Sequence, residues 1–326
     1  MTPTLVAAPL QAIDTEDRRF AVPFHASAEE MHRSLDRAGV VSPLWTLRRA
    51  EGKALVVDGF KRLEWLIRNG VDEVHCLAYP PDCGTRDLWL RRIEGKLHGS
   101  PLNPAEKAWL AKVLAGLLPE ETVRREYFPS LGLPATPQGV ERWVRLADSG
   151  TGLLEALAEE IVGERAALLL LEWEDADRDR CLSWLEELRC SASLQVEIVE
   201  RIAEIARGQG LEPRDVLDDP EAVEVVRNPG WNRRRKTQWI REWLYRKRYP
   251  RLSFREEEFR RRREAARLPA RVKLTPPKYF EGEEWEMRLT FRGPRELEEL
   301  AQAARDFSRS PALRDMLKPP PGGDGG

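Results

Sequence analysis

The hydrophobic pattern of this 326-residue chain changes along its length, from mixed strand-like and helix-like segments to helix-like segments alone. Before about residue 98, three β-like runs (TLVAAPLQAI, KALVVDG and VDEVHCLAY) alternate with two helical segments, SAEEMHRSLDRAG and FKRLEWLIRNG. Ser27 and Glu30 have the spacing of a capping box, and Gly39 and Gly70 follow the two helices as stop signals. Residues 1–98 are therefore predicted to form a small α/β domain.

Residues 99–226 carry helical patterns almost throughout. NPAEKAWLAKVLAGLL places Trp109, Val113 and Leu117 at i, i+4 and i+8. Four further helical segments follow: TPQGVERWVRLADS, GLLEALAEEIVGERAALLLLEW, DRDRCLSWLEELRC and SLQVEIVERIAEIARGQG. Because only short polar or Gly/Pro breaks separate them, the pattern predicts an all-α domain.

The last third of the chain divides again by composition. Residues 227–268 predict a basic helical arm. RVKLTPPKYF and EWEMRLTF are typical of two strands and are followed by a helical segment, which together predict a small C-terminal α/β unit over 269–317. Residues 318–326, KPPPGGDGG, predict a disordered tail.

Charge is strongly segregated along the chain. The net charge is −2, yet the segment from Arg227 to Lys273 holds 18 Lys/Arg against 5 Asp/Glu, while the remainder holds 35 basic and 50 acidic residues. Such a layout is typical of a polyanion-binding element on an acidic body. The alternative is a helix that pairs with the acidic helical region of the same chain. The charge of +13 exceeds what packing needs, so nucleic acid is favoured.

Aromatic residues interleave with the cations of this basic segment. Trp239 and Trp243, together with Ile240 and Leu244, predict an apolar stripe that docks the helix on a partner surface. The cations would then face phosphates. The predicted DNA contacts in this segment are Arg233, Arg234, Arg235, Lys236, Arg241, Lys247 and Arg248.

Several classes of protein are excluded by composition. The longest apolar run, Ala166–Leu171, is far shorter than the ~20 residues of a membrane-spanning helix. No basic stretch precedes the apolar start of the chain, and four cysteines do not make a disulfide framework, so a cytoplasmic protein is expected. Cys76 and Cys83 lack a usual zinc spacing, and no metal site or catalytic residue is predicted.

Three segments, in order, resemble the ParB/sulfiredoxin-like family. RAGVVSPLWTLR is similar to the family's "GxxQP(I/L)xVR" segment, LVVDGFKRLEWLIRNGVDEVHCLAY to its strand, turn, helix and strand, and RRIEGKLHGSPLNPAEKAW to its "ENLxR…LxPxExA" stretch. The resemblance covers about residues 5–110, and the helical region that follows suits the DNA-binding half of ParB proteins. It implies a ParB/RepB-like protein located on the nucleoid. Sulfiredoxin chemistry is excluded, because Phe60 stands where those enzymes place their cysteine.

The same resemblance implies a nucleotide site. In ParB proteins the "GERRxRA" loop binds the phosphates of CTP. Gly59 and Arg62 match this loop and Lys61 replaces one of its arginines conservatively, whereas Phe60 and Trp65 depart from it. Glu94 matches part of the "ENxxR" motif that holds Mg²⁺ and the triphosphate. A glycine before a helix start also suits phosphate binding on physical grounds. The alternative is an ordinary strand-to-helix turn whose Leu63 and Leu66 pack inward.

A helix-turn-helix is predicted over residues 120–147. Its second helix begins near Thr136, which would cap it, with Pro137 in the first turn. Val140, Trp143 or Val144, and Ala147 would pack inward. The DNA-reading residues on the other face would be Gln138, Arg142 and Arg145. An ordinary helical hairpin is the alternative.

The sequence therefore favours a ParB-like DNA-binding protein, of the partition or transcription-regulator type, modulated by CTP with Mg²⁺. Two alternatives stay open: a ParB-fold nucleotide enzyme, such as a CTPase switch or a small-molecule kinase, and a protein-interaction scaffold. A homodimer through residues 270–317 is also expected, because the C-terminal unit is too small to bury a good core alone.

Overall fold

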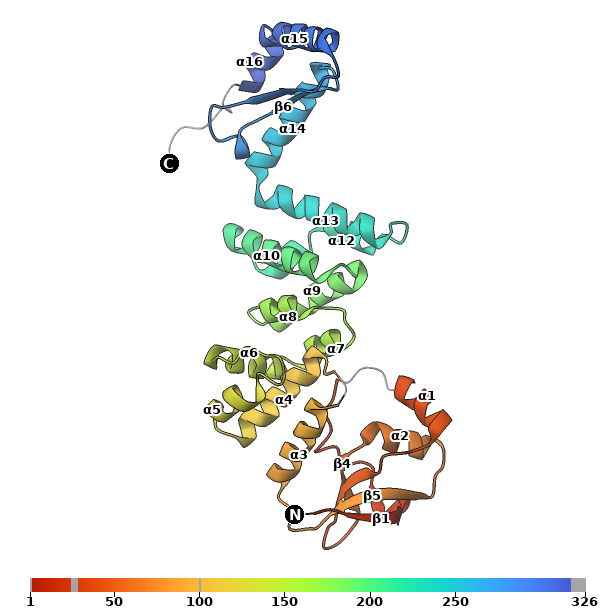
Figure 1. Ribbon diagram of the computed structural model, residues 1–326. Helices are drawn as coiled ribbons and strands as arrows, with labels where there is room; N and C mark the ends of the chain where they lie inside the picture. The colour runs from red at the N-terminus through yellow and green to blue at the C-terminus, as the bar shows by residue number, and fades with distance from the viewer. Residues whose placement is uncertain (1, 25–28, 100, 318–326) are drawn as a thin grey trace. The chain divides into compact units, whose positions relative to one another are not determined.

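The computed structural model describes residues 2–24, 29–99 and 101–317. It divides into two compact units, Met1–Glu200 with Glu212–Leu217, and Arg201–Leu211 with Asp218–Gly326 (Figure 1). The first unit contains a mixed α/β part followed by helices, and the second is mostly helical with one β-hairpin. Ser27, the expected capping residue, and the expected tail 318–326 lie outside the described residues.

The α/β part is built on a five-stranded sheet with strand order β1-β5-β3-β4-β2. Strand β5 pairs antiparallel with β1 and parallel with β3, while β4 pairs antiparallel with β3 and parallel with β2. Its elements are β1 (Thr4–Pro9), the 3₁₀ turn η1 (Leu10–Ala12), β2 (Ile13–Asp14), α1 (Glu29–Ala38), β3 (Leu44–Leu47), β4 (Ala54–Asp58), α2 (Phe60–Arg68), β5 (Glu73–Tyr79) and α3 (Thr85–Leu97). The expected first strand therefore ends at Pro9, and η1 separates it from β2.

Local sequence explains the centre of this sheet. Leu55, Val56 and Val57 of β4 are all buried, as expected for an uninterrupted apolar run inside a sheet. Helix α2 buries Leu63 and Leu66, which confirms the inward face expected for it. Gly39 and Gly70, the expected stop signals, adopt the left-handed conformation that glycine tolerates.

Helices complete the first unit. They are α4 (Pro104–Leu117), α5 (Glu120–Thr122), the π-helical turn η2 (Val123–Tyr127), α6 (Pro137–Asp148), α7 (Thr151–Ala158), α8 (Glu164–Leu170), α9 (Asp175–Leu188), the first part of α10 (Ala192–Gln209) and α11 (Pro213–Leu217). Asn103 and Glu106 form a reciprocal capping box at the start of α4.

The helix expected from the spacing of Trp109, Val113 and Leu117 is α4; these three side chains are half-buried, beside a fully buried ridge of Ala108, Ala111 and Leu114. One helical expectation was wrong. The expected long helix after Gly150 is two helices, α7 and α8. They are separated at Gly163, whose amide donates to the Gln195 side chain at 2.7 Å, a contact from a distant helix that no local pattern contains.

The second unit begins with the end of α10 and continues through α12 (Pro220–Arg227), α13 (Arg233–Arg248), α14 (Pro250–Ala265), β6 (Val272–Thr275), η3 (Lys278–Phe280), β7 (Glu286–Leu289), α15 (Pro294–Ser308) and α16 (Pro311–Leu317). Strands β6 and β7 form an antiparallel hairpin. Leu274, Phe307 and Met316 form a small core, against which Phe259 and Trp285 pack. Within the described residues, no helix is long and apolar enough to cross a membrane.

Candidate nucleotide and nucleic-acid sites

The turn between β4 and α2 requires glycine. Gly59 has φ +100°, and a Cβ atom there would lie 2.7 Å from Cδ2 of Leu44. Both the backbone conformation and the lack of space exclude other residues. The turn therefore brings the chain closely past β3 before α2 begins at Phe60.

Arg62, an expected phosphate ligand, makes three contacts within the protein. Its Nη2 pairs with the Asp58 carboxylate at 2.9 Å, and its Nη1 donates to the carbonyls of Ser42 and Pro43 at 2.8 and 2.9 Å. These bonds fasten the loop before β3 to the end of β4. A phosphate bound by Arg62 would have to compete with them.

Arg92 is a residue of this site that the sequence analysis missed. Its side chain is only 5% exposed, pairs with Asp58 at 3.0 Å, donates to the Val57 carbonyl, and lies 5.2 Å from the ring centre of Phe60. Burial lowers the pKa of Arg92, and the neighbouring Asp58 opposes that shift. An arginine on the inward face of α3, next to buried Leu88 and Ile93, was the available signal.

Two lysines lie near one buried carboxylate, that of Glu106, beside the start of α2. Lys96 of α3 pairs with Glu106 at 3.0 Å, and Glu106 is itself fixed by the backbone amide of Asn103. Burial lowers the pKa of Lys61; the charge of Glu106 opposes this shift and the charge of Lys96 adds to it. Lys61, Lys96 and Glu106 together carry a net charge of +1, and Glu64, which pairs with Arg18, also acts on Lys61.

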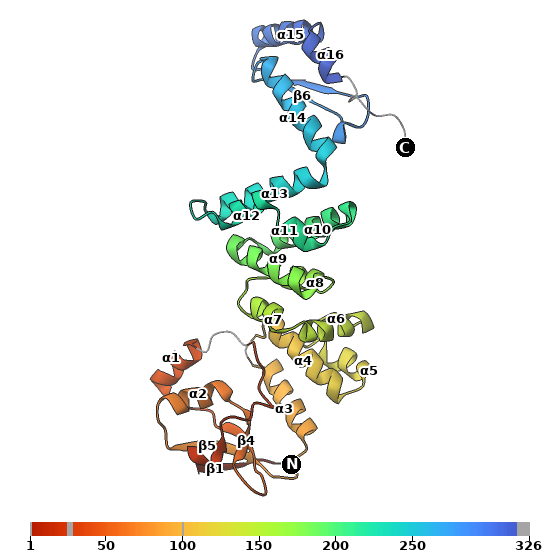
Figure 2. The same cartoon turned by 180° about the vertical axis from the view of Figure 1, so that it is seen from behind.

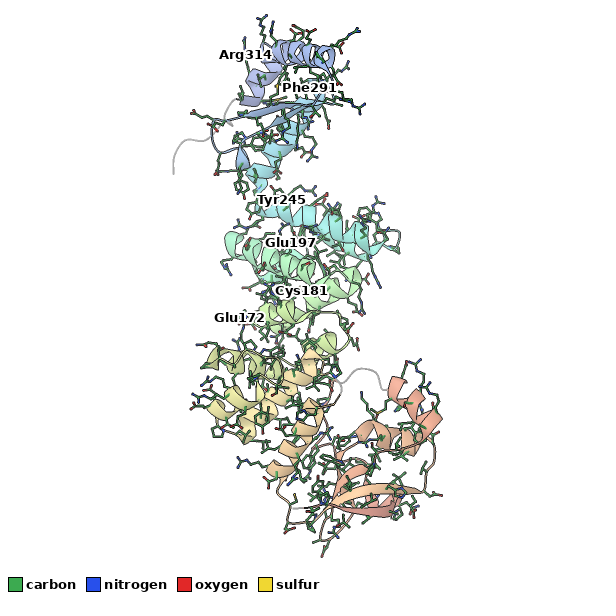
Figure 3. All side chains as sticks on the ribbon, in the orientation of Figure 1. Glu172, Cys181, Glu197, Tyr245, Phe291 and Arg314 are labelled. Atoms are coloured by element: carbon green, nitrogen blue, oxygen red, sulfur yellow. The ribbon has the colours of Figure 1, made fainter. Side chains whose placement is uncertain are left out.

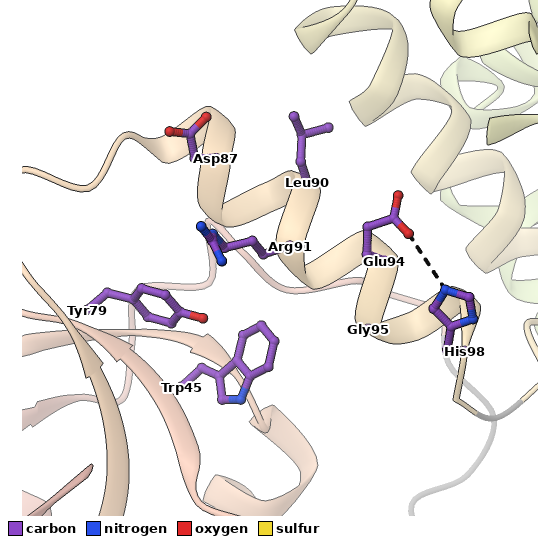
Figure 4. Close-up of a pocket in the computed structure, with 8 residues that line it drawn as sticks. All are labelled: Trp45, Tyr79, Asp87, Leu90, Arg91, Glu94, Gly95 and His98. Atoms are coloured by element: carbon purple, nitrogen blue, oxygen red, sulfur yellow. Dashed lines mark ion pairs between the residues drawn. The ribbon is translucent and has the colours of Figure 1, made fainter. Parts of the chain in front are cut away.

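Glu94 lies away from this corner. Residues 92 and 94 point about 200° apart around α3. Glu94 therefore lines a different cavity, of about 530 Å³, whose other lining residues are Trp45, Tyr79, Asp87, Leu90, Arg91, Gly95 and His98 (Figure 4). It lies 3.8 Å from His98. Burial and then the charge of Glu94 raise the pKa of Tyr127, which also shares a hydrogen bond with Glu94. The structure thus brings together Gly59, Lys61 and Arg62, but not Glu94.

The helix expected to read DNA is α6. Thr136 caps it by accepting a hydrogen bond from the Gly139 amide at 3.0 Å, and Pro137 occupies its first turn. Val140, Trp143 and Ala147 are buried and Val144 is only partly so, which resolves the alternative in favour of Trp143. Gln138, Arg142 and Arg145 are exposed, on the face expected for them.

Two of these three exposed residues also contact the end of α8. Arg142 donates to the Leu168 carbonyl at 3.4 Å, and Arg145 pairs with Glu172 at 3.3 Å. Arginines near the C-terminus of a helix are favourably placed against its dipole. A nucleic-acid phosphate or base would compete with long contacts to partly exposed groups, which are weak.

Part of the basic segment packs within the second unit. Ile240, Trp243 and Leu244 are buried in helix α13, which packs on α12, so the stripe expected to dock on a partner is used within the chain. Trp239 stacks on Trp243 with ring centres 6.3 Å apart. Lys236, an expected phosphate contact, is only 6% exposed, because it lies on this inward face.

The remaining cations differ in their surroundings. Lys247 pairs with Asp219 at 2.8 Å and Arg248 with Glu204 at 2.9 Å, both within the second unit, as in the alternative of internal pairing. Arg241 is half-buried. Arg233, Arg234 and Arg235 are exposed in the first turn of α13, and Arg235 lies 3.9 Å from the ring centre of Trp231.

No group of three or more His, Cys, Asp or Glu side chains within the described residues is arranged to hold a metal ion. No family model matches the chain, and no curated protein matches it.

Three solved structures to which this chain is similar are of ParB proteins. The C-terminally truncated chromosome-partitioning protein ParB from Caulobacter crescentus complexed with CTP-gamma-S has 18% identity and a TM-score of 0.24, covering 54% of this chain and 98% of that one. The same truncated protein complexed to the centromeric parS site has 16% identity and a TM-score of 0.34, covering 60% and 99%. A Pnob8-like ParB-N domain has 17% identity and a TM-score of 0.33, covering 73% and 98%.

Proposed function

We propose that this chain is a ParB-like DNA-binding protein that reads duplex DNA with helix α6. The observation that supports this best is the division of α6 into a buried face around Trp143 and an exposed face with Gln138, Arg142 and Arg145. Glutamine and arginine side chains form paired hydrogen bonds with base edges in the major groove. The Thr136 cap and Pro137 give this helix a sharp start after a turn, as in a recognition helix.

Affinity without sequence preference would come from the exposed start of α13. Arg233, Arg234 and Arg235 stand in the first turn of that helix, which contains no acidic residue. Three cations at a helix N-terminus oppose the helix dipole, at roughly 0.3–1 kcal/mol each. Phosphate contacts would offset this unfavourable arrangement.

Replacing Gln138 or Arg142 by alanine should cost about 1–3 kcal/mol of binding to a preferred site and little on other sequences, because base contacts carry the discrimination. The site would first be identified by genome-wide recovery of bound DNA, and affinities measured on that duplex and a scrambled one. Arg165→Ala, which removes an exposed arginine of α8, is the matched control. Equal losses on both duplexes would contradict base reading by α6.

We propose further that CTP binds beside the start of α2, where the ammonium groups of Lys61 and Lys96 would contact its phosphates. At a CTP concentration 100 times its dissociation constant, the free energy of unfolding should rise by ~2.7 kcal/mol. Thermal melts with CTP, ATP, GTP and UTP would measure this. Lys61→Met should abolish the shift and Lys53→Met, an exposed lysine before β4, should preserve it. No shift with any of the four nucleotides would refute the proposal.

The other expectations stand as predictions. A homodimer through residues 270–317 and a location on the nucleoid belong to the same ParB-like proposal. The nucleotide-enzyme alternative would need a metal ligand near the phosphates, and Glu94, expected there, lines the cavity with Trp45 and Tyr79 instead. We therefore favour the DNA-binding function over that alternative, and a protein-interaction scaffold would be indicated by loss of duplex binding with retention of a protein partner.

A further inference from the structure

The second unit contains a polar cavity in the bend between α13 and α14. Helix α13 ends at Arg248, Pro250 starts α14, and the two helices meet at an angle around Tyr249 (Figure 2). The cavity has a volume of about 390 Å³, within the range of roughly 300–1,000 Å³ that is usual for small-ligand sites. Its lining residues are Arg201, Gln238, Arg241, Glu242, Tyr245, Arg246, Ser253, Glu256, Glu257 and Arg260.

Arginines from three helices converge on this cavity. Arg201 comes from α10, Arg241 and Arg246 from α13, and Arg260 from α14. Arg201 is oriented by donating to the Arg241 carbonyl at 3.2 Å. The basic run visible in the sequence does not contain Arg201, so only the fold reveals the group.

Two of the three cavity glutamates accept hydrogen bonds from neutral groups. Glu242 accepts from the Gln238 amide at 2.5 Å, and Glu256 accepts from the Tyr245 hydroxyl at 3.0 Å. With four arginines and three glutamates, the cavity lining has a net charge of +1. It offers guanidinium groups for phosphates together with carboxylate oxygens, which accept hydrogen bonds from the N–H groups of bases. A nucleotide unit has both kinds of group.

Exposed aromatic rings occur around the same bend. Tyr249 is 40% exposed, Phe254 67% and Tyr279 59%. Arg248 lies 5.0 Å from the ring centre of Tyr249, and Lys278 lies 4.9 Å from that of Tyr279. A cation covers one face of a ring and leaves the other face open to a stacking partner.

Tyr279 is held in a costly backbone conformation. Tyr279 and Phe280 have φ values of 57° and 58°, a region that bulky residues rarely adopt. Arg255 of α14 fixes the turn by donating to the Phe280 carbonyl at 3.2 Å and lying 5.0 Å from its ring centre, while Phe280 packs against Phe259. Because these contacts anchor Phe280, the Tyr279 ring is left at the surface.

Two of the exposed rings, Tyr249 and Tyr279, are close to Tyr245 of the cavity. Tyr245, which lines the cavity, is 5.4 Å from Tyr249 between ring centres. Burial and the Glu256 hydrogen bond raise the pKa of Tyr245, and Tyr279 is near enough to contribute to that shift. Phe254 lies on α14 between Ser253, which lines the cavity, and Arg255, which holds the Tyr279 turn.

We propose that this bend binds a single nucleic-acid strand, with unpaired bases stacked on Tyr279 and Phe254 and phosphates against Arg246 and Arg260. Aromatic platforms beside a cationic groove are the usual means of holding single strands without sequence preference. This function goes beyond reading duplex DNA with α6, since the paired bases of a duplex do not expose their faces for stacking.

The test measures binding of the full chain to a labelled 20-nucleotide oligo(dT) and to a duplex of the same length. Tyr279→Ala and Phe254→Ala should each weaken oligo(dT) binding by about 5- to 150-fold, the usual loss for one stacked base. Both should leave duplex binding unchanged. Tyr279→Phe keeps the ring and should keep the affinity.

Phe291→Ala is the matched control, because Phe291 is an exposed ring of the same unit, 48% exposed, just after β7 (Figure 3). It should bind oligo(dT) as the unaltered chain does. If Tyr279→Ala disturbs its loop, Phe254→Ala on α14 still tests the idea separately. If both variants bind oligo(dT) as the unaltered chain does, the proposal is overturned. It is also overturned if the two variants change only the self-association of the protein, measured by light scattering. If α6 does not read DNA, Gln138→Ala and Arg142→Ala would not change the preference for one duplex over another, and oligo(dT) binding would be unaffected. The two proposals can therefore fail separately.

Discussion

Raising the salt concentration from 50 to 200 mM should weaken binding of this protein to duplex DNA by about 10³–10⁵-fold, if 6–10 phosphates are neutralised. Such contacts release counterions, and each contributes about 0.9 to the slope of log K against log salt concentration. Replacing Arg233, Arg234 and Arg235 together by alanine should therefore flatten that slope by up to about 2.7. The loss of affinity should be similar for every DNA sequence, since phosphate contacts carry no sequence information.

The structure supplies a matched control for this experiment. Lys247 and Arg248 belong to the same helix but pair with Asp219 and Glu204. Replacing these two residues by alanine should change the slope little. If the triple change leaves the slope untouched, the start of α13 does not contact DNA. If the control pair flattens it equally, those ion pairs open when DNA binds.

Signals that are local in the chain predicted the structure well. The apolar run Leu55–Val57 is a buried strand, because a strand that is buried on both faces carries apolar residues at consecutive positions instead of alternating apolar and polar ones. The Thr136 cap and Pro137 located the start of α6 within a residue, because capping depends only on neighbouring backbone groups. The buried face of that helix then followed from its period.

One expectation that depended on a distant contact was wrong. The single helix expected after Gly150 is the pair α7 and α8. The break between α7 and α8 depends on Gln195, which no local pattern includes.

In the candidate nucleotide site, too, a local signal was informative and a signal that depends on the fold was not. Gly59 could be recognised because its turn demands a residue without a side chain. Glu94 was placed in the site by its position along the chain, yet the phase of α3 turns it toward Tyr127, and Lys96 points toward Glu106 instead. A motif with one additional residue cannot reveal which face of a helix each of its members occupies.

Asp58→Asn should strongly destabilise the α/β part of the first unit. Asp58 is the carboxylate partner of Arg92, which is 5% exposed, and of Arg62. Removing its charge leaves a buried guanidinium uncompensated, which typically costs about 3–5 kcal/mol. Hydrogen exchange of the β4 amide groups would report this loss within the sheet itself, whatever the rest of the chain does. Asp82→Asn, at an exposed position, should change stability by no more than about 0.5 kcal/mol.

Replacing the cationic partner instead, by Arg92→Leu, should lower the free energy of unfolding by less than Asp58→Asn does. Asp58 then keeps Arg62 at 2.9 Å and remains 31% exposed, so its charge is still paired and partly hydrated. The Val57 carbonyl loses its donor, which accounts for about 1–3 kcal/mol. The double variant should be more stable than the sum of the two single losses implies, because it buries no unpaired guanidinium. If Asp58→Asn and Arg92→Leu lowered the free energy of unfolding equally, the Arg92 guanidinium would be hydrated. Its pairing with Asp58 would then not be what joins α3 to the end of β4.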